Sequence, residues 1–335
     1  MEIRNQKLIN AIIAKAQRDC PGSLAMIGIY GSFLTGDIHE KSDLDLLILI
    51  NDEKGYCLAS TFILEDEDIG HDLYCTTWEA LEHDAKFTHP HISKLMESKI
   101  VYCADDAHLT RLEQLRESAR NADTQEAARN LQKEAEAVFA KALLADTLAE
   151  ARFHAGNVMY NIFGAIALRN GRYFKLGTRR ILEEIDTMEY KPHNFSELVA
   201  TVVQAETLSD LHTSLTQLVK SLNTIFPKAE ITAEVYPGTY EEMFSNWRNK
   251  VYLAAKIGNQ FLAYDSMCSF DFMLRDLGHN MNVMDCYQPN DLNACAKAYD
   301  DILADYKKCY DTAGFAVKSY PNVDAFISEY EKKKA

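Results

Sequence analysis

The sequence predicts an α/β (α+β) domain with a small mixed sheet, followed by an all-α helical bundle. Short apolar runs alternate with helical segments in the first third of the chain. From residue 122 onward, Ala, Leu, Glu and Lys recur at helical spacing instead. This change of pattern predicts two domains, residues 1–120 and 121–335, and leaves a subdivision of the second near 227–240 open.

Each element has its own local signal. Residues 1–20 place apolar side chains at helical spacing among charges, which predicts an amphipathic helix rather than a signal peptide. A helix is expected from Trp78, and serines at N-cap positions predict helix starts near 196 and 209. The strands are predicted at 24–30, 43–50, 69–77 and 99–104, with one more near 56–64. The remaining helices are predicted at 125–153, 158–169, 240–277 (in one or two pieces) and 291–310, with a loop at 227–238.

Composition limits the function classes. The formal net charge is −15, from 50 acidic and 35 basic residues, which argues against a nucleic-acid partner. It suits a cationic acceptor or simply a soluble protein. No apolar run is long enough to cross a bilayer. The eight cysteines form no Cys-x-x-Cys pair, which predicts reduced thiols and, with no export signal, a cytoplasmic location. The oligomeric state stays open.

The most informative segment joins a Gly-Ser turn to two aspartates. An apolar run over 24–30 leads into Gly31-Ser32, and a second apolar run starts with Asp43 and Asp45. Residues two apart on a strand point to the same face, so these two carboxylates are expected to project together. Two carboxylates on one face suit Mg²⁺, which also binds substrate phosphate oxygens. Gly31 allows close approach of the backbone, and Ser32 with the following N–H groups can contact phosphate.

The same residues resemble a known family. Gly31, Ser32, Gly36, Ser42, Asp43 and Asp45 match the pattern of the nucleotidyltransferase superfamily of DNA polymerase β type. The pattern is most similar to that of aminoglycoside and other antibiotic adenylyltransferases with a C-terminal helical domain. The resemblance covers about the first third of the chain. It implies a nucleotidyltransferase fold, nucleotide contacts from Gly31, Ser32 and Ser42, and metal binding by Asp43 and Asp45.

The family also uses a third carboxylate from a later strand. Asp72 is the best candidate, either as a third metal ligand or as the general base that takes the proton of the acceptor hydroxyl. The acidic run at 65–68 is an alternative source, although like charges side by side favour an exposed turn. His71 is expected on the face opposite Asp72.

A basic cluster interrupts the acidic helical half. Arg172, Lys175, Arg179 and Arg180 lie within nine residues. These four cations could hold the triphosphate and stabilise the leaving pyrophosphate, with Lys175, Arg179 and Arg180 as the predicted nucleotide-binding residues. The alternative is an interhelical loop whose cations offset a helix C-terminus.

Taken together, the resemblance implies an antibiotic-resistance enzyme. It would use Mg²⁺ to transfer AMP from ATP to a hydroxyl of a small cationic acceptor, such as an aminoglycoside, and release pyrophosphate. Two alternatives are a protein-adenylylating enzyme similar to an antitoxin and a non-catalytic nucleotide-binding module. The large helical half argues against the first, and the intact Asp43 and Asp45 argue against the second.

Overall fold

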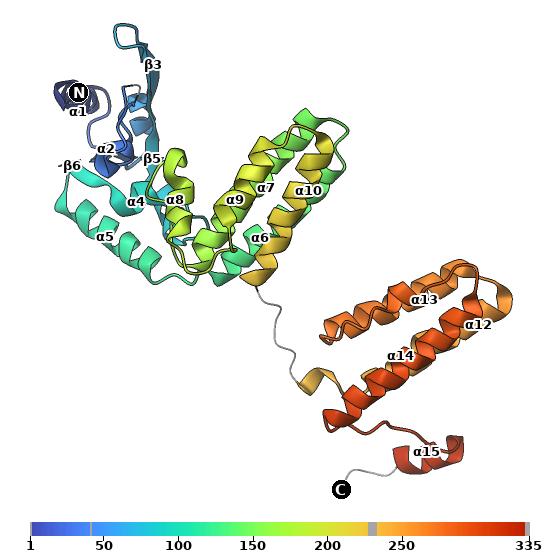
Figure 1. The fold of residues 1–335 in the computed structure, drawn as a ribbon. Helices are drawn as coiled ribbons and strands as arrows, with labels where there is room; N and C mark the ends of the chain where they lie inside the picture. The colour runs from blue at the N-terminus through green and yellow to red at the C-terminus, as the bar shows by residue number, and fades with distance from the viewer. Residues whose placement is uncertain (1, 41, 227–232, 332–335) are drawn as a thin grey trace. The chain divides into compact units, whose positions relative to one another are not determined.

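The computed structural model describes residues 2–40, 42–226 and 233–331 (Figure 1). The chain divides into two compact units, Met1–Lys228 and Ala229–Ala335. The first unit combines the sheet with the helices that follow it, and the described part of the second unit is helical. A small sheet followed by a largely helical region is the predicted fold class, which is confirmed.

The first unit is built on a four-stranded mixed sheet with the strand order β5-β2-β1-β6. The central strand β1 (Leu24–Ile29) pairs antiparallel with β2 (Leu46–Ile50) and with β6 (Lys99–Cys103). At the edge, β5 (Cys75–Thr77) runs parallel to β2. All five residues of β2 are buried, as expected for a strand covered on both faces.

A separate antiparallel hairpin holds β3 (Ser60–Leu64) and β4 (Ile69–Leu73). The prediction of one strand over 69–77 is therefore wrong, since β4 and β5 belong to different sheets. Burial alternates strictly along β4, whereas Cys75 and Thr76 are both buried next to β2, so the pattern changes at exposed Tyr74. The acidic run at 65–68 forms the exposed turn of this hairpin, as predicted.

Two cores cover the faces of the main sheet. Ile48 and Ile50 pack with apolar residues of α1 (Glu2–Asp19), which confirms the amphipathic first helix. Leu47 and Leu49 pack into a second cluster together with helices later in the chain. Fully burying one such side chain contributes about 1.5–3 kcal/mol, so β2 is firmly held. Asp43 and Asp45 lie directly before β2, so the position of the strand restricts theirs as well.

The remaining helices of the first unit include a bundle. In Figure 1, α6, α7, α9 and α10 lie side by side. The predicted single helix over 125–153 is wrong, because the chain breaks at 144–147 and Thr147 caps a new helix through its hydroxyl. These helices are α3 (Trp78–Ala85), α4 (Ser93–Glu97), α5 (Asp106–Arg120), α6 (Gln125–Leu143), α7 (Leu148–Arg169), α8 (Ile181–Asp186), α9 (Phe195–Gln204) and α10 (Leu208–Ser221).

The helices start near 196 and 209 as predicted, but the N-cap residues lie two positions before the predicted serines. Asn194 precedes α9, and the Thr207 side chain caps α10 by accepting the N–H of Asp210. Threonine supplies the same hydroxyl acceptor as serine, so a choice between them needs the geometry of the turn.

The second unit has its own core, which is rich in tyrosine. Tyr299 and Tyr306 are fully buried, and Tyr299 stacks on Phe270 with ring centroids 4.1 Å apart. Its helices are α11 (Thr239–Glu242), α12 (Asn249–Ile257), α13 (Gln260–Asp276), α14 (Leu292–Thr312) and α15 (Val323–Tyr330), with a π-helical turn over Met243–Arg248. The predicted loop at 227–238 lies partly outside the described residues.

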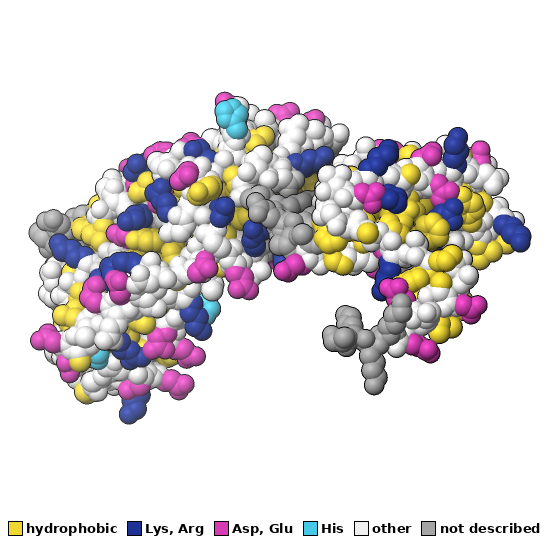
Figure 2. All heavy atoms as spheres, turned by 90° about the horizontal axis from the view of Figure 1, so that it is seen from below, with side chains coloured by type: hydrophobic (Ala, Val, Ile, Leu, Met, Phe, Trp, Pro, Cys, Tyr) yellow, Lys and Arg dark blue, Asp and Glu magenta, His cyan; other side chains and the backbone are white. Residues whose placement is uncertain are grey.

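Charge and thiol chemistry are unremarkable across both units. On the face shown in Figure 2, basic and acidic side chains are interspersed rather than gathered by sign. All eight cysteines are free, but only Cys20, Cys75 and Cys295 are buried. Among the described residues, every helix is too short or too polar to span a bilayer.

Candidate nucleotide site

Asp43 and Asp45 lie in an extended segment just before β2. The strand starts at Leu46, so its predicted start at residue 43 is wrong. Burial nevertheless alternates through this segment: Ser42 and Leu44 are buried, while Asp43 and Asp45 are half-buried. The backbone N–H of Tyr30 donates to the carbonyl oxygen of Asp45 at 3.1 Å. The alternation is the one expected if both aspartates point to the same face, and the Tyr30 contact places Asp45 beside the end of β1.

Gly31 touches the carboxylate of Asp45. A Cβ atom added at Gly31 would lie 2.0 Å from Oδ2 of Asp45, and the glycine has φ +71° and ψ −149°. This backbone region is open essentially to glycine alone. The Ser32 backbone N–H donates to the Asp45 side chain, which fastens the carboxylate to the turn. The Gly-Ser turn thus fixes one of the two aspartates.

Asp72 lies on β4, the second strand of the hairpin. The pairing of β5 with β2 begins at Cys75 and Ile48, and Asp72 lies three residues earlier on β4, which pairs with β3 instead. Asp72 is exposed, and its Oδ1 accepts the Thr61 hydroxyl at 3.1 Å. His71 is buried on the opposite face, as predicted, and burial lowers its pKa.

Tyr30 senses the charge of the three predicted carboxylates, although among the described residues their oxygens do not form a group close enough to share one metal ion. Burial, with smaller contributions from the charges of Asp45, Asp43, Asp72 and Asp84, raises the pKa of Tyr30 to about 12. All three aspartates therefore lie within electrostatic reach of this phenol. Sequence reasoning missed Tyr30, although it stands directly before Gly31 and is only partly buried. A tyrosine at the end of an apolar strand is more often a core residue, which explains the omission.

The ionised form of Asp45 is costly without a cation. Burial raises the pKa of Asp45, the charge of Asp43 raises it further, and the Ser32 backbone hydrogen bond lowers it only in part. Because the folded protein holds the proton of Asp45 more tightly than the unfolded chain does, protonation of Asp45 adds to the free energy of unfolding at low pH. This contribution is lost as the pH rises through the pKa of Asp45 in the folded protein. A cation bound to Asp45 would offset the unfavourable free energy of its negative charge.

We therefore expect Mg²⁺ to stabilise the protein more strongly as the pH rises. Mg²⁺ competes with the proton on Asp45, so its affinity should begin to fall at a higher pH than an ordinary aspartate would allow. The measurement is the Mg²⁺-induced shift in Tm across about pH 4 to pH 8. A shift that is independent of pH over this range would contradict the assignment of Asp45 as a ligand.

The two serines hold the loop between Gly31 and Asp43. Ser32 is half-buried and starts the four-residue helix α2 (Ser32–Thr35), which Gly36 ends with φ +77°. The N–H groups of Leu34 and Thr35 donate to the carbonyl of Gly31, so these two predicted phosphate donors are used inside the turn. Ser42 is buried and its hydroxyl oxygen accepts the His39 N–H at 2.9 Å. Ser42 therefore closes the loop that leads to Asp43.

Arg179 and Arg180 contact Asp37, which lies 142 and 143 residues earlier in the chain. Nη2 of Arg179 lies 2.5 Å from Oδ1 of Asp37, and Nη1 of Arg180 lies 3.3 Å from the same oxygen. Asp37 directly follows Gly36. Burial alone would raise the pKa of Asp37, but the two arginine hydrogen bonds hold it below its usual range. Sequence reasoning missed Asp37 because its partners are distant in sequence.

Lys175 binds a different carboxylate. Its Nζ lies 2.8 Å from Oε1 of Glu97, whose pKa is lowered by this contact and by the Tyr173 hydroxyl against the effect of burial. The backbone N–H groups of Lys175 and Leu176 donate to the buried carboxylate of Glu184, which shapes the basic segment. The predicted cations are thus divided between Asp37 and Glu97.

A second group of possible metal ligands lies at the C-terminal end of α3 and in the segment that follows it. His83, Asp84 and His89 each offer one ligand atom within 4.8 Å of the others. Nδ1 of His89 accepts the His91 N–H, which leaves the ring proton on Nε2, 3.3 Å from Oδ1 of Asp84. Nζ of Lys94 lies 3.5 Å from the other oxygen of Asp84. Oδ2 of Asp84 is buried without a hydrogen-bond partner among the described residues, so this group has the residue types and spacing of a possible metal site.

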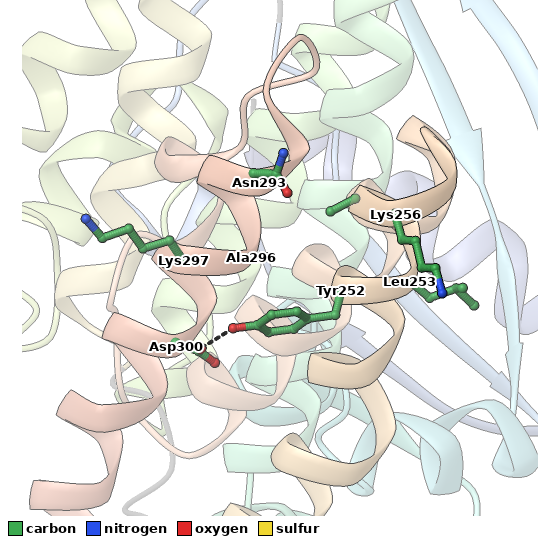
Figure 3. A pocket seen from close by; sticks show the side chains of 8 residues that line it. Tyr252, Leu253, Lys256, Asn293, Ala296, Lys297 and Asp300 are labelled. Atoms are coloured by element: carbon green, nitrogen blue, oxygen red, sulfur yellow. Dashed lines mark hydrogen bonds between the residues drawn. The ribbon is translucent and has the colours of Figure 1, made fainter.

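A cavity of about 540 Å³ lies between α12 and α14 of the second unit. Figure 3 shows Tyr252 directed toward Asp300, to which its hydroxyl donates, while Lys256 and Lys297 point away from each other. Asp300 is also paired with Arg248 at 2.6 Å. The polar groups of this cavity do not converge, and none of the predicted site residues lines it.

The comparisons with known proteins agree with the first unit. Residues 10–102 match the family model of the nucleotidyltransferase domain. The matched segment contains β1, β2, the Gly-Ser turn and all three aspartates. No curated protein matches the chain. The N-terminal segment is therefore assigned to the nucleotidyltransferase superfamily, which supports nucleotidyl transfer as the general reaction.

Proposed function

We propose that the protein transfers AMP from ATP to a hydroxyl of a small cationic acceptor and releases pyrophosphate. One observation carries the proposal: the Gly31–Gly36 turn contacts the carboxylate of Asp45 at Gly31 and, through Asp37, holds two arginines at its other end. Carboxylates suit the cation that accompanies a nucleotide, and guanidinium groups suit its phosphates.

The donor set fits Mg²⁺. Asp43 and Asp45 offer oxygen ligands only, and the raised pKa of Asp45 is the mark of a carboxylate that lacks a counter-charge. When bound there, Mg²⁺ would neutralise charge on the phosphates during transfer. The half-buried position of both aspartates limits competition from solvent.

The chain's own residues supply positioning and proton transfer. The acceptor oxygen attacks the α-phosphorus, the bond from that phosphorus to the bridging oxygen breaks, and pyrophosphate leaves. Asp72 receives the hydroxyl proton, since it is exposed and oriented by Thr61. Arg179 and Arg180 stabilise the charge that develops on the leaving group, and Ser32 contacts the same phosphates. The helices after residue 121 would supply the acceptor pocket.

The choice of acceptor is tested by following labelled ATP. The protein is incubated with Mg²⁺, α-labelled ATP and a panel of aminoglycosides, alone and with cell extract. We expect label on a small molecule together with free pyrophosphate. Label on a protein would support the protein-adenylylating alternative. Nucleotide binding without any transfer would support a non-catalytic module.

The arginines provide a second prediction. Arg179→Ala and Arg180→Ala should each raise the Kd for a non-hydrolysable ATP analogue about 10-fold or more, since each loses charge-assisted hydrogen bonds to phosphate. Arg172→Ala is the matched control, because Arg172 binds the Thr187 hydroxyl instead of Asp37. Calorimetric titration measures the Kd of the wild type and of the three variants. Equal Kd values for these four proteins would show that Arg179 and Arg180 do not contact the nucleotide.

A further inference from the structure

Asp37 joins the two parts of the proposed nucleotide site. Its carboxylate accepts hydrogen bonds from Arg179, Arg180 and the Thr35 hydroxyl, the last at 3.3 Å. Its backbone N–H donates to the carbonyl of Ser32 at 3.2 Å. The side chain is only 11% exposed, whereas that of Arg179 is 69% exposed. The carboxylate is therefore fixed to the turn, and the arginines are held by it.

The geometry leaves the guanidinium groups able to bind a further anion. A guanidinium carries five N–H donors. Arg179 uses Nη2 toward Asp37, while Arg180 uses Nη1 toward Asp37 and Nε toward Glu183 at 2.8 Å. These contacts engage part of each donor set and restrict the orientation of the rest. A side chain that is already held in place by another polar group loses less conformational entropy when it binds its ligand.

We propose that Asp37 is a positioning residue that orients Arg179 and Arg180 toward the triphosphate of the bound nucleotide. The inference rests on the proposed function, because it assumes that the arginines meet a nucleotide. The opposite role is also testable: a carboxylate on the arginines could compete with phosphate, and its removal would then tighten binding.

The test is a mutant cycle on the full chain. A non-hydrolysable ATP analogue with Mg²⁺ is titrated into the wild type, Asp37→Ala, the Arg179→Ala/Arg180→Ala double variant, and the variant with all three changes. Asp37→Ala should weaken binding about tenfold, as loss of a residue that orients a ligand group typically does. The same change should have no further effect in the double variant, because the residues that it orients are gone.

Controls separate positioning from folding. Asp37→Asn keeps the shape and loses the charge, so it should weaken binding even if Asp37→Ala is unstable, and Asp37→Glu should restore part of the affinity. Asp66→Asn, in the exposed hairpin turn, should bind as the wild type does. Unchanged or tighter binding by both Asp37→Ala and Asp37→Asn, or an equal loss in the double variant, would overturn the proposal. A wild type that binds no nucleotide would overturn the proposed function itself.

Discussion

Asp45→Asn is expected to lower the rate of nucleotidyl transfer about 10³-fold or more. The change removes a charged ligand from the proposed metal pair, and metal-assisted charge stabilisation contributes several kcal/mol to such reactions. The fold should survive, because asparagine has the same shape and can still accept the Ser32 N–H. The metal-free Tm should stay unchanged or rise, since the variant lacks a carboxylate whose raised pKa marks its charge as costly.

The rate of labelled AMP transfer and the unfolding curve without metal measure both effects. Asp66→Asn is the matched control, since it removes a carboxylate from the exposed turn of the hairpin and leaves the Gly31 region unchanged. Turnover by Asp45→Asn at the wild-type rate would refute its role as a metal ligand. A large fall in metal-free Tm would show that Asp45 is instead a structural residue.

Gly31→Ala is expected to combine loss of transfer with loss of stability. The φ and ψ of Gly31 would cost an alanine about 1–3 kcal/mol. The added Cβ would also lie 2.0 Å from Oδ2 of Asp45, so the carboxylate must move. Moving the proposed metal ligand Asp45 out of its place should abolish measurable transfer, because phosphoryl transfer depends on the exact position of the groups that bind the metal and the phosphates. Chemical denaturation and the transfer assay report the two losses separately.

Gly36→Ala provides the comparison within the same turn. Gly36 also has positive φ, at +77°, but nothing lies within 4 Å of an added Cβ. This variant should lose about 1–2 kcal/mol of stability from backbone strain and keep transfer activity. If both glycine variants retained equal activity, contact between Gly31 and Asp45 would have no part in the chemistry.

The sequence predicts some parts of this site better than others, because some site residues are close together in the sequence and others are brought together only by the fold. The Gly-Ser turn and the spacing of Asp43 and Asp45 are local, and periodicity two is enough to place both aspartates on one face. The contact of Arg179 with Asp37 spans 142 residues and needs the tertiary fold. Lys175 illustrates the limit: its charge was visible in the sequence, but its partner Glu97 was not.

The fold shows the same contrast. Element types follow from hydrophobic period, and most helices and strands appear where that period predicts them. The break between β4 and β5 at Tyr74 depends on which neighbours the two strands find, and no local pattern determines that. The same holds for residues 144–147, where an alanine-rich period continues but the chain turns to pack α7 on α6.

The two-stranded hairpin that carries Asp72 has a consequence for how this chemistry could change over time. Asp43 and Asp45 are tied to the central sheet, whereas Asp72 sits on a pair of strands whose ladder is independent of that sheet. Replacements within the hairpin can shift the proposed proton acceptor and leave the proposed cation ligands undisturbed. Descendants of this chain could therefore acquire new acceptors without rebuilding the part that handles the nucleotide.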